Sequence, residues 1–405
     1  MHDVVIGHLQ MGHGMKNNWW QPPRLRIGKG SEEKRHATWL ELFYDLVYAV
    51  VLAALAKNLN RDVSLSSFFR FAILFVPVWW SWIGAAFYAT RFDTDDIGHR
   101  LLTAVQMVAV AALAVNVHHG LGESSAGFAL SYAAVRAVQV VEYLRAERYV
   151  AAARPLITRY KRGFAIAAAI WLVSAFVPAP VRFVLWALGL TVDFATPISA
   201  GQLHSQLAPD TSHLPERFGL FTLIVLGEVI AAVVDGVTEQ KWNVQSAIAA
   251  VFGLSIAFSL WWVYFDGIND VAIRAAHEAG RVRVYQIWLY AHLPLTIGLT
   301  ATAVGLEHVV LSAPGMLPDA SRWLLCSAVA LCLLALGVIH LTAVTTETKP
   351  SSEVKAAYRI GTAFVVVVLA VAGVGLLAVV LIGLVAVACA VQVVLDLLGR
   401  SRSDT

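Results

Sequence analysis

Residues 361–398 read GTAFVVVVLAVAGVGLLAVVLIGLVAVACAVQVVLDLL and contain almost no polar side chain. Because a helix needs about 20 apolar residues to cross the ~30 Å hydrocarbon core of a membrane, this run is long enough for two crossings. Gly373, Gly375 and their neighbours indicate where the chain turns back. The run therefore predicts two transmembrane helices joined by a tight turn.

Similar apolar stretches recur from Trp39 almost to the end of the 405-residue chain. Hydrophobic side chains make up 58% of the residues and charged ones 14%, whereas an average soluble domain has about 25% charged residues. This composition excludes a water-exposed globular fold, a disordered chain and a β-barrel, whose segments alternate in polarity over about ten residues. Cys326, Cys332 and Cys389 lie in apolar stretches, which favours core packing over disulfides or a thiolate metal site.

We predict an all-α integral membrane protein with about twelve transmembrane helices in two parallel six-helix halves. The expected division is a cytoplasmic tail at 1–38, a first half at 39–203, a cytoplasmic connecting loop at 204–215, a second half at 216–398 and a cytoplasmic tail at 399–405. The spans are expected to begin near Trp39, Phe68, Leu101, Ala126, Gly163, Val181, Phe218, Gln245, Tyr285, Trp323, Tyr358 and Leu377.

Two sequence echoes favour the division into halves. Glu41-Leu-Phe43 and Glu216-Arg-Phe218 are offset by 175 residues, and Phe92-Asp93 and Phe265-Asp266 by 173. Six crossings return the chain to the face from which it started, so the second half would repeat the first without inversion.

The distribution of Lys and Arg predicts the orientation, because cytoplasmic loops carry an excess of both. With twelve spans, 23 basic residues fall on one side, including six in residues 1–38 and six between Arg145 and Arg162. We therefore expect a multi-pass protein of the inner (plasma) membrane with both termini in the cytoplasm. The net charge of +3 does not indicate a nucleic-acid partner. The opposite side has Lys57, Arg61, Arg182, Lys241 and Arg322.

Ionisable residues inside apolar spans are candidates for a functional site, because their insertion into a membrane is costly. Glu228 lies twelve residues beyond Glu216, about 18 Å along a helix, and is therefore expected near the middle of the membrane. The alternative is a neutral carboxylic acid that bonds to a neighbouring helix. The set that we expect to couple protons, or to act as acid and base, is Glu41, Asp45, Glu216, Glu228 and His292.

Glu41, Asp45 and Tyr48 follow helical spacing and share one helix face. Two adjacent carboxylates should have separate pKa values, so that one could hold a proton near neutral pH. Glu41 could instead complete a capping box with Thr38. His292 is buried in the ninth span, where a satisfied core histidine is the alternative. The sixth span is expected to be an interrupted helix that lines a cavity, on the basis of Asp193, Thr196, Pro197, Ser199 and Gln202.

These residues lead to the first hypothesis, a proton-coupled secondary transporter in which Glu228 faces the carboxylates of the first span. The second hypothesis is an intramembrane enzyme for an isoprenoid or prenyl-diphosphate-like substrate. Its site would combine Asp93, Asp95, Asp96 and Arg100 with Asp266, Asp270 and Arg274.

Paired acidic clusters can hold Mg²⁺ against a diphosphate, here through Asp93, Asp96, Asp266 and Asp270. Asp93 to Asp96 also resembles the D-x-D-D proton-donating motif of protonation-type terpene cyclases. Both clusters could equally be solvated helix ends that anchor a loop. No nucleotide-binding or zinc motif is present, so we expect no cofactor apart from Mg²⁺ under the enzyme hypothesis. The expected partners are the lipid bilayer and a small or lipid-soluble substrate, and the oligomeric state stays open.

Three longer motifs resemble those of the bacterial low temperature requirement A (LtrA) family. They are HATWLELFYDLV at 36–47, RFDTDD at 91–96 and ERFGLFTLIVLGE at 216–228. The resemblance implies a polytopic membrane protein with a link to growth in the cold, and it names no substrate or reaction. A non-catalytic membrane protein for cold adaptation is therefore a third hypothesis. The polar positions that match the family's are Glu41, Asp45, Asp93, Asp95, Asp96, Glu216 and Glu228.

Overall fold

The computed structural model describes residues 20–25, 37–94, 96–201, 203, 213–240, 242–267, 282–342 and 349–401. This part of the chain is helical apart from connecting segments and a two-stranded antiparallel sheet of β1 (Arg24–Leu25) and β2 (Phe92–Asp93). The first group of helices consists of α1 (Trp39–Arg61), α2 (Leu65–Arg91), α3 (Ile97–Val117), α4 (Ser125–Tyr149), α5 (Arg154–Ser174) and α6 (Val181–Ser199), with a 3₁₀ turn at Ala151–Ala153. The second group consists of α8 (His213–Glu239), α9 (Val244–Gly267), α11 (Val282–Leu311), α12 (Asp319–Thr342), α13 (Lys349–Ala372) and α14 (Ala378–Ser401).

Ten helices of the described part are long and apolar enough to cross a membrane. This confirms the prediction of a multi-pass α-helical protein. The helices α4 and α5 are also long, with 25 and 21 residues, but they are not among the ten. The reason is their charge, since α5 begins with Arg154, Arg159, Lys161 and Arg162 within its first nine residues. The segment between Arg145 and Arg162, expected as a loop, is therefore mostly helical.

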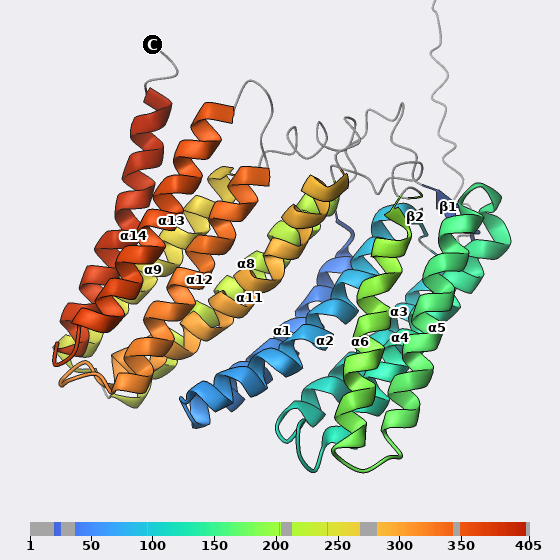
Figure 1. The fold of residues 1–405 in the computed structure, drawn as a ribbon, viewed down its shortest axis with the longest axis horizontal. Helices are drawn as coiled ribbons and strands as arrows, with labels where there is room; N and C mark the ends of the chain where they lie inside the picture. Colours follow the sequence, from blue (N-terminus) through green and yellow to red (C-terminus); the bar gives the residue numbers. More distant parts are fainter. Residues whose placement is uncertain are drawn as a thin grey trace, which may run out of the picture.

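The two groups of helices form adjacent bundles (Figure 1). In the first, α3 packs against α1 and α4, and α5 packs against α4 and α6. In the second, α11 packs against α8 and α12, and α13 packs against α12 and α14, which is the same order of neighbours. The bundles meet where α1 and α2 contact α8 and α11.

Local sequence explains several helix ends. Thr38 precedes α1, and its hydroxyl accepts a hydrogen bond from the backbone N–H of Glu41 at 3.2 Å, as a capping residue should. Between α13 and α14 the chain turns at Gly375, whose φ of 78° is one that glycine adopts at little cost. The expected turn near Gly373 and Gly375 is thus confirmed.

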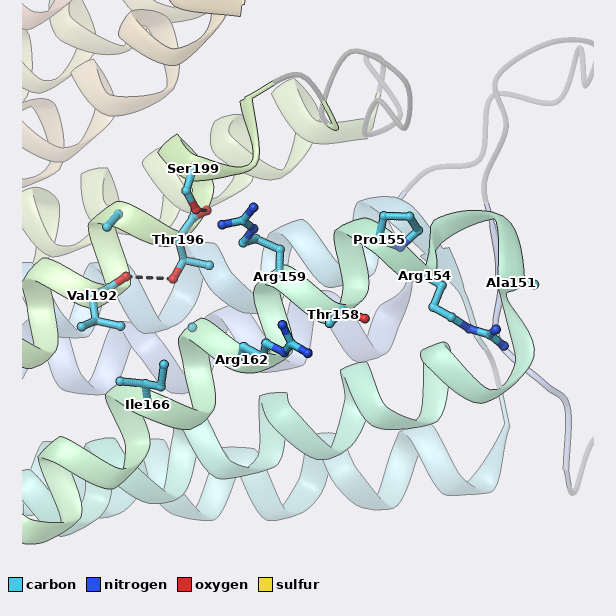
Figure 2. A pocket seen from close by; sticks show the side chains of 12 residues that line it. Ala151, Arg154, Pro155, Thr158, Arg159, Arg162, Ile166, Val192, Thr196 and Ser199 are labelled. Atoms are coloured by element: carbon cyan, nitrogen blue, oxygen red, sulfur yellow. Dashed lines mark hydrogen bonds between the residues drawn. The ribbon is translucent and has the colours of Figure 1, made fainter.

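The interruption expected in the sixth span does not occur between Val181 and Ser199, and Gln202 lies outside the described residues. Pro197 lies in the last turn of α6, and Asp193 forms an ion pair with Arg136 of α4. The polar residues Thr196 and Ser199 nevertheless line a cavity, a groove between α5 and α6 (Figure 2).

Candidate functional site

A buried ion-pair cluster connects the two bundles. Asp45 of α1 accepts hydrogen bonds from Arg217 of α8 at 2.7 Å and from the indole N–H of Trp82 at 2.8 Å, both at its Oδ1 atom. A second nitrogen of Arg217 lies 3.1 Å from Oε2 of Glu41. Asp45 is 0% exposed and Arg217 is 1% exposed. One guanidinium group therefore makes ion pairs with two carboxylates of the neighbouring bundle.

His213 extends the cluster at the start of α8. Its Nε2 atom lies 3.1 Å from Oε2 of Glu41, and its Nδ1 atom lies 3.4 Å from Oε2 of Glu216. The structure therefore brings together Glu41, Asp45 and Glu216, as we expected. Arg217 and His213 are members that the sequence analysis missed. The signal was available in Arg217, which directly follows Glu216, but the sequence analysis counted Arg217 only among the 23 basic residues of the expected cytoplasmic side.

A second buried polar network lies within the first bundle. Arg136 of α4 is 3.2 Å from Oδ1 of Asp193 on α6, and Tyr132 donates a hydrogen bond to Oδ2 of Asp193 at 2.6 Å. Arg136 also donates to Gln139 at 2.6 Å. Gln139 Nε2 donates to the backbone carbonyl of Ser81 on α2 at 2.8 Å. The hydroxyl of Ser81 lies 2.9 Å from that of Tyr48 on α1, which in turn lies 3.1 Å from the hydroxyl of Tyr44. This network links α6 to the face of α1 that also carries Asp45.

Glu228 lies in a different place, a cavity of about 510 Å³ between α1, α8 and α11. The expected contact between Glu228 and the carboxylates of the first span is therefore not observed. Glu228 is half-buried near the middle of the 27-residue α8. The charged residues of this acidic pocket are Glu228, Asp235, Glu239 and Glu307, with Lys57 as the basic one. Glu307 accepts a hydrogen bond from Asn60 at 2.7 Å.

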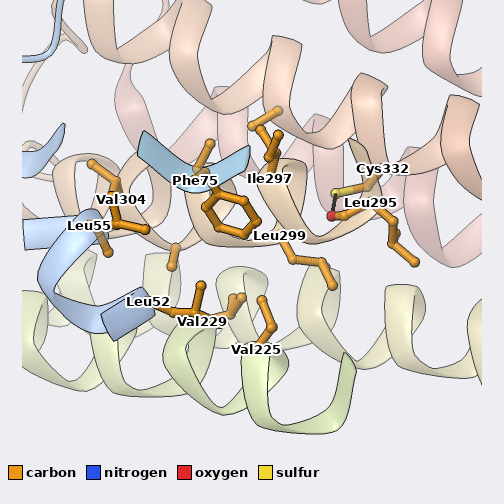
Figure 3. Close-up of a cluster of buried hydrophobic side chains, with 14 of the residues drawn as sticks. Leu52, Leu55, Phe75, Val225, Val229, Leu295, Ile297, Leu299, Val304 and Cys332 are labelled. Atoms are coloured by element: carbon orange, nitrogen blue, oxygen red, sulfur yellow. Dashed lines mark hydrogen bonds between the residues drawn. The ribbon is translucent and has the colours of Figure 1, made fainter. Parts of the chain in front are cut away.

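An apolar layer separates the ion-pair cluster from the acidic pocket. Along α1, Leu52 and Leu55 lie between Asp45 and Lys57, and along α8, Val225 lies between Arg217 and Asp235. Figure 3 shows these side chains packed with others from α2 and α11. The buried members of the layer are Leu52, Leu55, Phe75, Val225, Val229, Leu295 and Leu299. The two polar sites thus occupy opposite ends of one interface, and an apolar barrier closes the space between them.

His292 belongs to neither site. It is 0% exposed, and its Nδ1 atom donates to the carbonyl of Trp288 at 2.9 Å, because a carbonyl can only accept. Its Nε2 atom can then accept from the hydroxyl of Tyr264 at 3.1 Å. This geometry is that of a neutral, satisfied core histidine, and the structure does not bring His292 to the expected acidic site.

In the first acidic cluster, Asp96 caps the N-terminus of α3. Asp96 accepts hydrogen bonds from His99 N at 3.1 Å and from Arg145 of α4 at 2.5 Å. Burial opposes ionisation, but the hydrogen bonds from Arg145, His99 and Gln21 outweigh it and lower the pKa of the Asp96 carboxyl below its ordinary value. Asp96 is therefore an ionised anchor between helix ends.

The rest of the predicted enzyme site is largely outside the described residues. This applies to Asp95, Asp270 and Arg274 and to the side chain of Asp93, whereas Arg100 lies in the first turn of α3 and Asp266 at the end of α9. Among the residues that the structure describes, no group of three His, Cys, Asp or Glu side chains could hold a metal ion.

Comparison with known proteins identifies the family. The family described as "Bacterial low temperature requirement A protein (LtrA)" matches residues 36–398. An uncharacterized protein of Rhizobium meliloti (strain 1021), RA0937, is 26% identical over 289 residues, which are 69% of this chain and 71% of that protein. No solved structure matches significantly. With a match that covers both bundles and the ion-pair cluster between them, the chain belongs to the bacterial low temperature requirement A family.

Proposed function

We propose that this protein is a proton-coupled secondary transporter of the inner membrane, with twelve crossings in two parallel halves and both termini in the cytoplasm. One observation carries the proposal. The acidic pocket and the ion-pair cluster lie at opposite ends of the interface between the bundles, and the apolar layer separates them. A transporter that alternates between two open states needs such a path, with a site for the solute and a barrier that can move.

The repeated order of helix neighbours supports the two parallel halves. It also supports crossings by α4 and α5, since α4 packs between α3 and α5 and α5 between α4 and α6. The charges of α4 are compatible with a crossing because Arg136 and Glu142 are buried within the protein. Charged side chains that face the bundle interior avoid the cost of contact with lipid.

The ion-pair cluster can couple protonation to movement of the bundles. Arg217 holds α8 to α1 through Glu41 and Asp45. Protonation of one carboxylate would remove one of the two ionic contacts that Arg217 makes with α1, while the other carboxylate still balances the guanidinium charge. A proton that arrives at Glu41 or Asp45 would therefore weaken the contact between the two bundles.

The charge of the acidic pocket indicates the class of solute. Four carboxylates and one ammonium group line it, and a cleft lined by one sign of charge concentrates ions of the other sign. A cationic solute that exchanges for protons fits this pocket best. Glu228, at the deep end of the pocket, is the group that would bind the proton and the solute in turn.

The test uses the full protein in liposomes with an imposed pH gradient, and it measures uptake of a panel of organic and inorganic cations. Glu228→Gln retains the shape of the side chain but removes its titration, so we expect uptake to lose its dependence on the pH gradient while expression stays near that of the wild type. Glu123→Gln, in the exposed turn before α4, is the matched control and should behave as the wild type.

Full pH response in Glu228→Gln would refute the coupling role of Glu228. Absence of uptake for the whole panel, with turnover of a prenyl diphosphate in the same liposomes, would favour the enzyme hypothesis instead. No contact among the described residues favours that hypothesis at present, since Asp96 is already paired with Arg145.

A further inference from the structure

The groove between α5 and α6 is the largest of the cavities described above, at about 800 Å³. One end of the groove is basic and polar, and Figure 2 shows Arg159 extending toward Thr196 and Ser199 of the facing helix. The polar lining residues are Arg154, Thr158, Arg159, Arg162, Thr196 and Ser199. Neither the ion-pair cluster nor the acidic pocket shares any of them.

The three arginines have no ion-pair partner among the residues that the structure describes. Glu147 of α4 accepts instead from Thr158 at 2.7 Å and from the ammonium group of Lys161. Arg154, Arg159 and Arg162 are exposed. Within nine residues of helix, the groove therefore presents three exposed guanidinium groups, of which Arg154 also acts electrostatically on the Glu147 carboxylate.

The other end of the groove, farther along α5, is apolar. It is lined by Ile166 of α5 and by Val192 and Ala195 of α6, and Ile166 is 52% exposed. The same faces continue with the exposed side chains of Leu188 and Val184 on α6. A ligand in this groove would meet guanidinium groups at one end and a surface suited to hydrocarbon at the other.

We propose that this groove binds an anionic phospholipid of the cytoplasmic leaflet. The phosphate oxygens accept from Arg159 and Arg162, the hydroxyls of Thr158 and Ser199 contact the remaining polar atoms of the headgroup, and an acyl chain lies along Ile166 and Val192. Arginine suits this role because its planar group donates two parallel hydrogen bonds to phosphate. Basic pockets between membrane helices on the cytoplasmic side are known to bind such headgroups.

The groove favours a lipid over a free phosphate because half of its lining residues are apolar and most of these are exposed. A free anion would use only the arginine end and would leave Ile166 and Ala195 in contact with water. The proposal does not depend on the transport activity, but it takes the cytoplasmic side from the topology given under the proposed function and needs α5 and α6 to border the lipid with their basic ends at the membrane surface.

The experiment measures the thermal stability of the purified full chain in detergent after addition of phosphatidylglycerol, phosphatidylcholine or inorganic phosphate, together with the lipids retained in native mass spectrometry. We expect phosphatidylglycerol to be retained and to raise the unfolding temperature, and the other two to have little effect. In Arg159→Gln/Arg162→Gln the affinity for phosphatidylglycerol should fall by about 25-fold, at about fivefold for each arginine.

Arg148→Gln is the matched control, because Arg148 is an exposed arginine of α4 that does not line the groove. It should retain the lipid as the wild type does. Equal retention of phosphatidylcholine, or no loss in the double variant, would overturn the proposal. The same stabilisation by inorganic phosphate would show a site for free anions. If the double variant elutes as an aggregate, Arg159→Lys/Arg162→Lys replaces it, and unchanged retention at raised salt then counts against the proposal.

Discussion

Asp45 shows most clearly how a single residue is tied to the rest of the molecule. It is buried, and one of its oxygens accepts from both Arg217 and Trp82. A charge in such a place is tolerated only when it is paired and hydrogen-bonded. The pair contributes more to holding α1 in a defined position against α8 than to net stability, since a buried ion pair can often be replaced by apolar residues without loss.

Asp45→Asn should destabilise the protein by about 3 kcal/mol, the lower end of the range for breaking a buried pair, because Arg217 retains Glu41 at 3.1 Å. Thermal unfolding in detergent measures this. The double variant Asp45→Leu/Arg217→Leu should recover part of the loss, since it removes both members of this pair, while Glu41 loses Arg217 and keeps only His213 at 3.1 Å. If the loss of stability in the double variant equals the sum of the losses in Asp45→Leu and Arg217→Leu, the two side chains are not coupled.

Asp96 predicts a dependence of stability on pH. Its pKa is lowered in the folded protein, so its stabilising contribution is complete above the unfolded value of about 3.9 and is lost as the pH falls through the folded value. Asp96→Asn should therefore lower the unfolding temperature at pH 7 and have a smaller effect near pH 3. A loss of the same size at both pH values would contradict this account of the Asp96–Arg145 pair.

At the scale of elements, small residues decide how closely the membrane helices approach. A Cβ atom placed on Gly305 of α11 would lie 2.9 Å from the Cα atom of Leu325 on α12. Backbone cannot move aside as a flexible side chain can. Small residues at helix contacts are the usual means by which membrane helices gain close packing.

Gly305→Ala should consequently destabilise the protein by about 1–3 kcal/mol, the cost of overpacking. Gly361→Ala on α13 is the matched control, because nothing lies within 4 Å of its added Cβ. That variant should be neutral or stabilised by up to about 1 kcal/mol through helix propensity. The comparison of the two unfolding temperatures checks the prediction, and equal effects would rule out close contact of α11 and α12 at Gly305.

At the scale of the whole molecule, two bundles share one narrow interface of α1 and α2 with α8 and α11. The polar contacts across this interface include the ion-pair cluster at one end and the Asn60–Glu307 hydrogen bond at the other. A motion of one bundle against the other would break contacts at one end while it keeps those at the other. The orientation of the whole assembly in the membrane then decides which end faces the cytoplasm.

Cysteine labelling tests that orientation. Ala152→Cys in the turn between α4 and α5 should react with a membrane-impermeant maleimide only from the cytoplasmic side, and Glu123→Cys only from the outside. The native Cys326, Cys332 and Cys389 are buried and should give little background. Labelling of both positions from the same side would contradict the proposed crossing by α4, and the reverse pattern would invert the topology.

Much of the fold could be predicted from the sequence, because hydropathy and helical period are local properties. The turn at Gly373 and Gly375 and the shared face of Glu41 and Asp45 agree with the structure. The beginning of α5 was placed too late, near Gly163 and not at Arg154. A helix that extends beyond its apolar part with a charged first turn gives no hydropathy signal.

The sequence alone determined that this chain is a helical membrane protein and which ionisable residues it carries within its helices. Only the tertiary structure decided how these residues are combined: Asp45 with Arg217, which is 172 positions away, and Glu228 with Glu307 in a separate pocket. The physical reason is that the free-energy cost of placing an ionisable side chain in the membrane is judged for each residue separately, from its neighbours in the sequence. Its partner depends on which helix faces meet, and that is set by side-chain packing over the whole interface between the two bundles.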